Sequence, residues 1–313
     1  MKVAVICNSD SLAFPAVNQL HVQQVLAGVA VPLRSSRQLL GPLLSIGVSR
    51  DRVQLLDKKG WCTQMGDWLS RISADAVWVF GFPWLIPASL LNSVSLGFFN
   101  FHFGELPKYK GADPIFWQLR NNEAVATLTV HKMTEDIDAG PVVLQKQLPQ
   151  IKGENYGLLC QRLGFMAAEL LPQLLGNVKP FETVLTDETA EPTAYFKKPG
   201  SEELKIKWHE QSADEIECLV NAANPKYDGA TTWIRNAEVR ILEASPAEIQ
   251  LQEGFKPEPG TIVYADAVYG LIVACRESRF LKINMVHMRE GYFSGSKLFS
   301  MGIKAGEKFF NLN

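Results

Sequence analysis

The stretch Val3-Ala-Val-Ile-Cys7, followed by Asn8-Ser9-Asp10, decides the fold class of this chain. An apolar run that ends abruptly at polar residues is typical of a strand buried on both faces of a parallel sheet, with a turn into a helix after it. We expect that helix from about Pro15 to Leu26 and a second strand from Gly28 to Pro32.

The same alternation continues through the first half of the chain. Further strands are expected at Val53 to Leu56, Ala76 to Phe80, Phe98 to His102, Thr127 to Met133 and Val142 to Leu148. Helices are expected at Arg37 to Leu44, at Trp61 to Ile72, from Pro114 onward, and at Tyr156 to Leu175. Strands that alternate with helices predict an α/β fold with a doubly wound, mostly parallel sheet. Its ligand crevice would lie at the carboxyl ends of the strands.

The second half of the chain has a different pattern. A helix is expected at Ala213 to Ala223, and short strands at Thr231 to Ile234, Val239 to Glu243, Thr261 to Ala265, Gly270 to Cys275 and Leu281 to Met285. Short strands separated by Gly and Pro predict a small barrel. Residues 186–202 are rich in Thr, Glu, Pro, Gly and Lys, as domain linkers are. The expected domains are therefore 1–185 and 203–313, joined by that linker.

Composition narrows the classes of protein. With 313 residues, 47% of them hydrophobic, the chain is long enough for two domains with buried cores. A net charge of −2 provides no general attraction to phosphate backbones. The five cysteines are scattered and never occur as C-x-x-C, which argues against a disulfide framework and favours a cytoplasmic location. The sequence shows neither a signal peptide nor a membrane-spanning run, so no membrane partner is expected.

Three polar residues stand out near the expected crevice. Asn100 and His102 lie two residues apart at the end of a strand, and Asp138 lies in the turn after the next strand. Alone, each has a structural explanation: His102 as a hydrogen-bonded residue, Asn100 as a turn cap, and Asp138 as a turn residue before Gly140. Together, an amide donor, an imidazole and a carboxylate can bind a carbonyl, stabilise its tetrahedral adduct and handle a proton.

The ordered set of residues around these three resembles the signature of the formyltransferases that use 10-formyltetrahydrofolate, the family of methionyl-tRNA formyltransferase. The matching residues are Asn100, His102, Leu106, Pro107, Gly111, Asp138 and Gly140. Ser9 to Leu20 is similar to the first strand-to-helix turn of the family. Leu204 to Trp208, Asn224-Pro225 and Gly295 to Gly306 look like its C-terminal OB-like barrel domain. The resemblance covers nearly the whole chain.

This resemblance implies a set of site residues. Asn100, His102 and Asp138 would be catalytic: the amide of Asn100 and a ring N–H of His102 would donate to the carbonyl oxygen, and Asp138 would hold the imidazole and favour its protonated form. The donor 10-formyltetrahydrofolate would be bound by Gly81, Phe82, Pro83, Trp84, Leu85, Asp136, Ile137 and Gly140. The loop beside the acceptor would comprise Leu106, Pro107, Lys108, Lys110 and Gly111.

The resemblance also has departures. The family often carries Pro-Ser after the histidine, where this chain has Phe103 and Gly104. In the family, a basic loop that contains glycine enters the acceptor stem of the tRNA. The corresponding segment of this chain is Val31 to Leu39, whose only basic residues are Arg34 and Arg37. The acceptor amine is therefore either initiator methionyl-tRNA, which the overall architecture favours, or an amino sugar linked to a nucleotide, which the altered loop favours.

Two further possibilities concern the class of protein and metals. A binding protein that kept the fold and lost turnover would be a folate-dependent regulator; the intact polar trio argues against this. His131, His209 and His287 are widely separated and lack nearby ligand partners, so no metal site is expected. His131 lies in the middle of an expected strand and is interpreted as structural.

Overall fold

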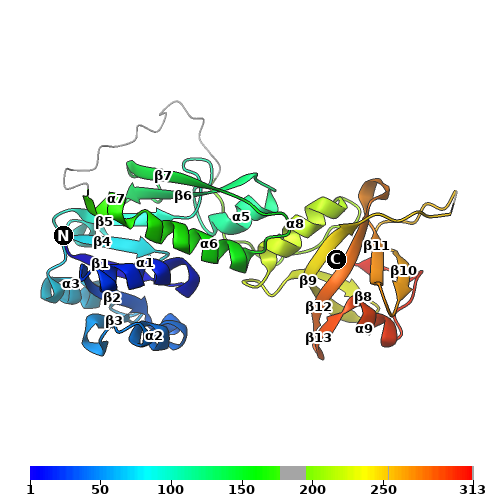
Figure 1. Ribbon diagram of the computed structural model, residues 1–313, viewed down its shortest axis with the longest axis horizontal. Coiled ribbons are helices and arrows are strands. Elements are labelled where there is room, and N and C mark those ends of the chain that lie inside the picture. The colour runs from blue at the N-terminus through cyan, green and yellow to red at the C-terminus, as the bar shows by residue number, and fades with distance from the viewer. Residues whose placement is uncertain (177–194, 253, 312–313) are drawn as a thin grey trace. The chain divides into compact units, whose positions relative to one another are not determined.

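The computed structural model describes residues 1–176, 195–252 and 254–311 (Figure 1). These form two compact units. The first comprises Met1–Pro114, Val125–Pro149 and Cys160–Phe196, and the second Ile115–Ala124, Gln150–Leu159 and Lys197–Asn313. Part of the expected linker at 186–202 lies outside the described residues.

The first unit is built on a seven-stranded sheet in the order β3-β2-β1-β4-β5-β6-β7 (Figure 1). Its strands are β1 (Val3–Cys7), β2 (Leu26–Pro32), β3 (Val53–Leu56), β4 (Ala76–Phe80), β5 (Gly97–His102), β6 (Val125–Lys132) and β7 (Val142–Pro149). The first five strands are parallel, while β6 runs antiparallel to β5 and to β7. The predicted doubly wound, mostly parallel α/β sheet is confirmed.

Helices cover both faces of this sheet. They are α1 (Asp10–Val22), α2 (Ser36–Ser45), α3 (Trp61–Ile72), α4 (Ala88–Leu91), α6 (Tyr156–Glu169), the start of which belongs to the second unit, and α7 (Leu171–Gly176). Ala4 and Ile6 of β1 join a core cluster with α3 and α4. Because side chains alternate along a strand, Val3 and Val5 face the opposite layer. All five residues of β1 are buried, as the apolar run predicted.

Some boundaries differ from the expectation. Helix α1 begins at Asp10, whose acidic side chain suits a helix N-terminus, and β2 already begins at Leu26, which pairs with Val3. The helix expected from Tyr156 to Leu175 is divided into α6 and α7. Pro172 is the second residue of α7, and proline cannot continue a preceding helix because it lacks an N–H and its ring clashes with the earlier turn.

The second unit is rich in short strands, as predicted, and the structure shows that they pair antiparallel. Helix α5 (Pro114–Arg120) belongs to this unit from Ile115 onward. The other elements are α8 (Ala213–Ala223), β8 (Ala230–Ile234), β9 (Ala237–Ala247), β10 (Ile262–Asp266), β11 (Gly270–Ala274), β12 (Phe280–Met288), β13 (Gly291–Ser294), α9 (Gly295–Ser300) and β14 (Phe309–Phe310). The sheet order is β10-β11-β12-β9-β8-β14, with β13 on β12. A bridge between Thr261 and Lys308 links the two ends of this sheet in the manner of a barrel. The sequence reasoning missed the short elements β13, α9 and β14.

Candidate active site

The candidate site is built on β5 and its antiparallel neighbour β6. Asn100 and His102 lie two residues apart on β5, so their side chains share one face of the sheet. Across the strand pair, Asn100 is opposite His131 and His102 is opposite Thr129. His131 therefore stands beside the two residues that the sequence singled out.

Asp138 comes from the connection between β6 and β7. Its backbone is left-handed, with φ of 50°, a conformation that is uncommon for residues other than glycine. Gly140 allows the turn to close, because a Cβ there would lie 1.7 Å from the carbonyl oxygen of Lys132. The sequence reasoning assigned Gly140 to donor binding; its contacts show a backbone approach that only glycine permits.

The carboxylate of Asp138 is the centre of the cluster. Its Oδ1 lies 3.3 Å from Asn100 Nδ2, 3.6 Å from His102 Nδ1 and 3.5 Å from His131 Nε2. Its Oδ2 accepts a hydrogen bond of 3.0 Å from the backbone N–H of Gly111. The structure thus brings together the three residues of the expected catalytic set, and His131 with them.

Asp138 is held in its ionised form. Burial opposes the charge, but hydrogen bonding from His131, the charge of His102 and the N–H of Gly111 outweigh it and hold the pKa of this carboxyl below its usual range. A buried carboxylate with several N–H partners is a negative charge held in one position, and it can orient a nearby imidazole.

His102 is buried, and its two ring nitrogens have different partners. Nε2 lies 2.8 Å from the carbonyl oxygen of Tyr109, which can only accept, so Nε2 carries a hydrogen. Nδ1 faces Asp138. Burial lowers the pKa of His102, while Asp138 and the Tyr109 carbonyl work in the opposite direction. The neutral ring is therefore a proton acceptor at Nδ1, and only the imidazolium has an N–H there.

His131 and the Tyr109 carbonyl are the site groups that the sequence reasoning missed. His131 Nε2 lies 3.2 Å from Asn100 Nδ2, so this histidine, which the sequence indicates as structural, contacts the candidate site. The usable signal was its position, seven residues before Asp138 and within the strand that adjoins Asn100. The Tyr109 carbonyl carries no sequence signal, because every residue has one.

The loop after β5 is fixed by its own packing. Leu106 and Tyr109 are buried, and the Gly104 carbonyl accepts a hydrogen bond of 2.7 Å from Thr129 Oγ1. A Cβ on Gly104 would lie 2.5 Å from Pro114 Cβ and 3.0 Å from His102 Nε2. This crowding gives a physical reason why the chain has glycine where the family often has serine.

The loop's lysines differ in their surroundings. Lys108 is exposed, with Nζ 5.3 Å from the centre of the Tyr109 ring, and Lys110 is partly buried. Pro107 precedes them and is partly buried as well. These positions put one lysine at the surface of the loop that also carries Gly111, the backbone partner of Asp138.

The segment after β4 suits a flat heterocycle. Trp61 stacks on Trp84 at 5.4 Å and meets Phe82 edge-on at 5.2 Å, so these rings are engaged with the protein. In the part of the chain that the structure describes, the N–H groups of Gly81 and Leu85 make no hydrogen bond. Unpaired backbone donors beside apolar walls fit a pterin that is read by main-chain hydrogen bonds.

Other predicted donor-binding residues lie in the same connection as Asp138. Asp136 and Ile137 are exposed, Ile137 by 49%. The carbonyl of Asp136 accepts a hydrogen bond of 3.3 Å from Thr134 Oγ1. Like Leu85, which is 64% exposed, Ile137 offers an apolar surface that a bound heterocycle would cover.

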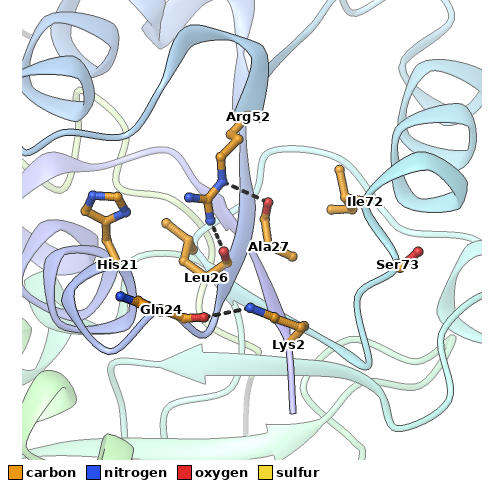
Figure 2. A pocket seen from close by; sticks show the side chains of 8 residues that line it. All are labelled: Lys2, His21, Gln24, Leu26, Ala27, Arg52, Ile72 and Ser73. Carbon is orange, nitrogen blue, oxygen red and sulfur yellow. Dashed lines mark hydrogen bonds between the residues drawn. The ribbon is translucent and has the colours of Figure 1, made fainter.

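A cavity of about 460 Å³ lies at the opposite end of the parallel strands from the candidate site (Figure 2). It is lined by Lys2, His21, Gln24, Leu26, Ala27, Arg52, Ile72 and Ser73. Figure 2 shows Arg52 donating to the carbonyls of Leu26 and Ala27, and Lys2 to that of Gln24. These cations satisfy backbone groups where β2 begins. The cavity therefore lies at the amino ends of the parallel strands, away from Asn100 and His102.

Two negative findings concern the described residues alone. Among residues 1–176, 195–252 and 254–311, no group of three or more His, Cys, Asp or Glu side chains could hold a metal ion. Within the same ranges, no helix has both the length and the apolar character that crossing a bilayer requires.

Comparisons with known proteins cover both halves of the chain. The family model described as formyl transferase matches residues 1–175, and the model of the formyl transferase C-terminal domain matches residues 200–299. A methionyl-tRNA formyltransferase from Aromatoleum aromaticum is 28% identical over 243 residues, which cover 77% of this chain and 74% of that protein.

Solved structures show the same fold. HypX from Aquifex aeolicus, in complex with tetrahydrofolic acid, aligns with a TM-score of 0.61 and 14% identity over 97% of this chain and 48% of that one. A sugar N-formyltransferase from Shewanella sp. aligns with a TM-score of 0.58 and 18% identity over 75% of this chain and 93% of that one.

These comparisons confirm the predicted family resemblance. They also confirm, at the level of the family, the expected N-formyltransferase enzyme class and the expected donor, 10-formyltetrahydrofolate. The N-terminal match alone extends over more than half of the 313 residues. The chain belongs to the formyl transferase family.

Proposed function

We propose that this protein transfers the formyl group of 10-formyltetrahydrofolate to the amino group of methionyl-tRNA, with Asn100, His102 and Asp138 as its catalytic residues. The observation that carries the proposal is the Asp138 carboxylate, with the side-chain nitrogens of Asn100 and His102 3.3 and 3.6 Å from Oδ1. Bound at Gly81 to Leu85 and at Asp136 and Ile137, the donor supplies an electrophilic formyl carbon. The reaction takes place in the cytoplasm.

Asn100 acts on the formyl oxygen, and His102 and Asp138 act on the proton of the attacking amine. Asn100 Nδ2 donates to the formyl oxygen as this oxygen gains charge. The neutral ring of His102 takes the proton of the attacking amine at Nδ1, because its Nε2–H is already given to the Tyr109 carbonyl. Asp138 then stabilises the imidazolium, whose new N–H returns the proton to N10 of the folate as the bond between N10 and the formyl carbon breaks, so that tetrahydrofolate and the formylated amine leave. The ring N–H expected from the sequence is thus available only after proton transfer.

The central test is the replacement of His102. We expect His102→Ala to lower transfer at least about a hundredfold, because general-base catalysis contributes roughly 10² to 10⁴. The circular dichroism spectrum and folding cooperativity should be retained. His209→Ala, at an exposed position of the second unit, is the matched control and should keep full activity. A His102→Ala protein with most of its activity would contradict the proposed role.

The same assay separates an enzyme from a folate-dependent regulator. The protein is incubated with 10-formyltetrahydrofolate, with and without the acceptor amine, and tetrahydrofolate is followed. Release of tetrahydrofolate that depends on the presence of the amine supports formyl transfer. Binding of the donor without release under any amine would favour the regulator, since a fold alone does not establish turnover.

A second acceptor is favoured by one observation. The segment after β2 consists of a 3₁₀ turn at Leu33–Ser35 followed directly by α2, and its cations are Arg34 and Arg37, both exposed. A protein that holds tRNA usually neutralises many phosphates. This compact segment therefore supports a nucleotide-linked amino sugar as the alternative acceptor. The match of the C-terminal family domain and the named relative support methionyl-tRNA.

Salt dependence distinguishes the two acceptors. Binding of initiator methionyl-tRNA should weaken steeply between about 50 and 200 mM salt, and Arg34→Gln/Arg37→Gln should reduce the slope by about two, roughly one for each lost phosphate contact. The matched control is Lys58→Gln/Lys59→Gln, which removes two exposed cations elsewhere. Formylation of the amino-sugar nucleotide without detectable tRNA binding would select the alternative.

A further inference from the structure

Phe196 lies in the first unit, beside the loop that supports the candidate site. Its backbone N–H donates to the Lys110 carbonyl at 2.8 Å, and its carbonyl accepts from the Ala112 N–H at 2.8 Å. These two hydrogen bonds form a parallel β-bridge between Gly111 and Phe196. Gly111, placed between the two hydrogen bonds, gives its own N–H to Asp138 Oδ2.

The approach of the two backbones depends on glycine. A Cβ on Gly111 would lie 2.3 Å from the Phe196 carbonyl oxygen, and its φ of 113° is unfavourable for other residues. The orientation of the Gly111 N–H towards Asp138 is therefore tied to the position of the Phe196 backbone.

The ring of Phe196 reaches the second support of the site. It stacks on Tyr109, with ring centres 5.2 Å apart and planes at 24°. Tyr109 is 2% exposed, and its carbonyl accepts the hydrogen of His102 Nε2. Aromatic pairs in this geometry are stabilised beyond the effect of the area that they bury, which favours one position of the loop.

We propose that Phe196 is a positioning residue for catalysis: through Gly111 it fixes Asp138, and through Tyr109 it fixes His102. The inference rests on the proposed function, because it takes these two residues as catalytic. Phe196 acts by holding the loop from Tyr109 to Ala112 against the sheet.

Loosening this loop has defined consequences. Asp138 would lose a backbone donor that favours its ionised form, and His102 would lose a carbonyl acceptor and part of the attraction of Asp138. The titration of His102 should then change, because the burial that lowers its pKa most, the charge of Asp138 and the Tyr109 carbonyl would all be altered. Donor binding, which uses the segments after β4 and β6, should change little.

The test compares Phe196→Ala with Phe196→Tyr, which retains a stacking ring, and with Tyr195→Ala. Tyr195 is the preceding aromatic residue and is 50% exposed, which makes it a matched control. We expect Phe196→Ala to lower kcat about ten- to a hundredfold, the range for a small displacement of a catalytic group, with KM for the donor changed less than about twofold. Phe196→Tyr and Tyr195→Ala should stay near wild type.

A spectroscopic readout separates positioning from general destabilisation. In histidine-labelled protein without donor, the His102 ring signal, assigned by its absence in His102→Gln, should titrate at a different pH in Phe196→Ala than in the wild type. The His209 signal should not move. Should Phe196→Ala fail to fold, Phe196→Leu carries the test: it retains apolar volume without stacking and should show the same two changes in smaller degree.

The outcomes distinguish this inference from the proposed function. Full kcat and an unchanged His102 titration in folded Phe196→Ala, or in Phe196→Leu, would overturn the role of Phe196, while an inactive His102→Ala would leave the proposed function standing. An active His102→Ala would refute the proposed catalytic role of His102, whatever Phe196 does.

Discussion

At the scale of single residues, the site depends on one carboxylate in an uncommon backbone conformation. Asp138 is left-handed, and the turn that places it requires glycine at position 140 because of the Lys132 carbonyl. Backbone strain of this kind persists where the surrounding structure over-determines it. Here, hydrogen bonds from the Gly111 N–H and the Asn100 side chain help to hold Asp138 in this conformation.

The buried imidazole makes stability depend on pH. The folded-state pKa of His102 lies below its ordinary value of 6.5, so the unfolded chain binds the extra proton more readily. The stabilisation is present above about pH 6.5 and is lost as the pH falls towards and through the folded-state value. We expect His102→Gln to lose less stability than the wild type between about pH 7.5 and 5.5.

Urea unfolding at both pH values measures this difference. His209→Gln, which removes an exposed ring, is the control and should retain the wild-type pH dependence. An equal loss of stability on acidification in His102→Gln and in the wild type would show that the buried ring makes no such contribution.

The sequence could reveal some of the site residues and not others. Asn100, His102 and Asp138 occur in an ordered pattern with glycine and proline at fixed spacing, so they could be predicted. His131 lies in a strand of mostly apolar, buried residues, where a histidine is usually a core residue; only the register of β6 on β5 places it beside Asn100. Phe196 is distant in sequence from Gly111, and nothing local predicts their pairing.

At the scale of elements, the packing of α6 on α1 depends on one glycine. A Cβ on Gly164 would lie 2.0 Å from the backbone carbonyl oxygen of Ser11, which cannot move without displacing the start of α1. We expect Gly164→Ala to destabilise the protein by about 1–3 kcal/mol, as overpacking does. Chemical denaturation measures the change.

Gly41 in the middle of α2 is the matched control. Apart from its chain neighbours and the backbone of its own helix, no atom lies within 4 Å of the place where its Cβ would stand. Gly41→Ala should change stability by less than about 1 kcal/mol, because alanine loses less conformational freedom in a helix while its Cβ is crowded by the ring of Pro42. A Gly164→Ala protein as stable as Gly41→Ala would show that α1 and α6 adapt to the added methyl group.

Continuous apolar runs identified the buried strands, whereas short elements near the end of the chain gave no pattern. The buried strands β1 and β4 are continuous apolar runs, and their bounds matched the expectation. The short elements α9 and β14 have six and two residues, too few for a period to appear. The division between α6 and α7 was signalled by Pro172, and the sequence reasoning passed over it.

At the scale of the whole molecule, the two compact units are not two continuous stretches of chain. Residues 115–124 and 150–159 cluster with 197–313. Phe116 meets Tyr227 edge-on, with ring centres 5.5 Å apart, and the Tyr156 hydroxyl accepts a hydrogen bond of 2.7 Å from Lys226 Nζ. A linear pattern of strands and helices cannot reveal such an arrangement, because each segment looks locally like part of the domain around it.

A chain that ends at residue 202 should therefore lose more than its last domain. Residues 115–124 and 150–159 would lose the partners around Pro225 and Tyr227, while β1 and β4 would keep their internal pairing. We expect amide hydrogens in these two segments to exchange much faster in the 1–202 fragment than in the full chain, with the amides of β1 and β4 still protected. Full-length Phe116→Ala, which removes one ring from this contact, should raise exchange in 115–124 to a smaller extent. Equal protection of both segments in the fragment and the full chain would mean that their stability does not depend on residues 203–313.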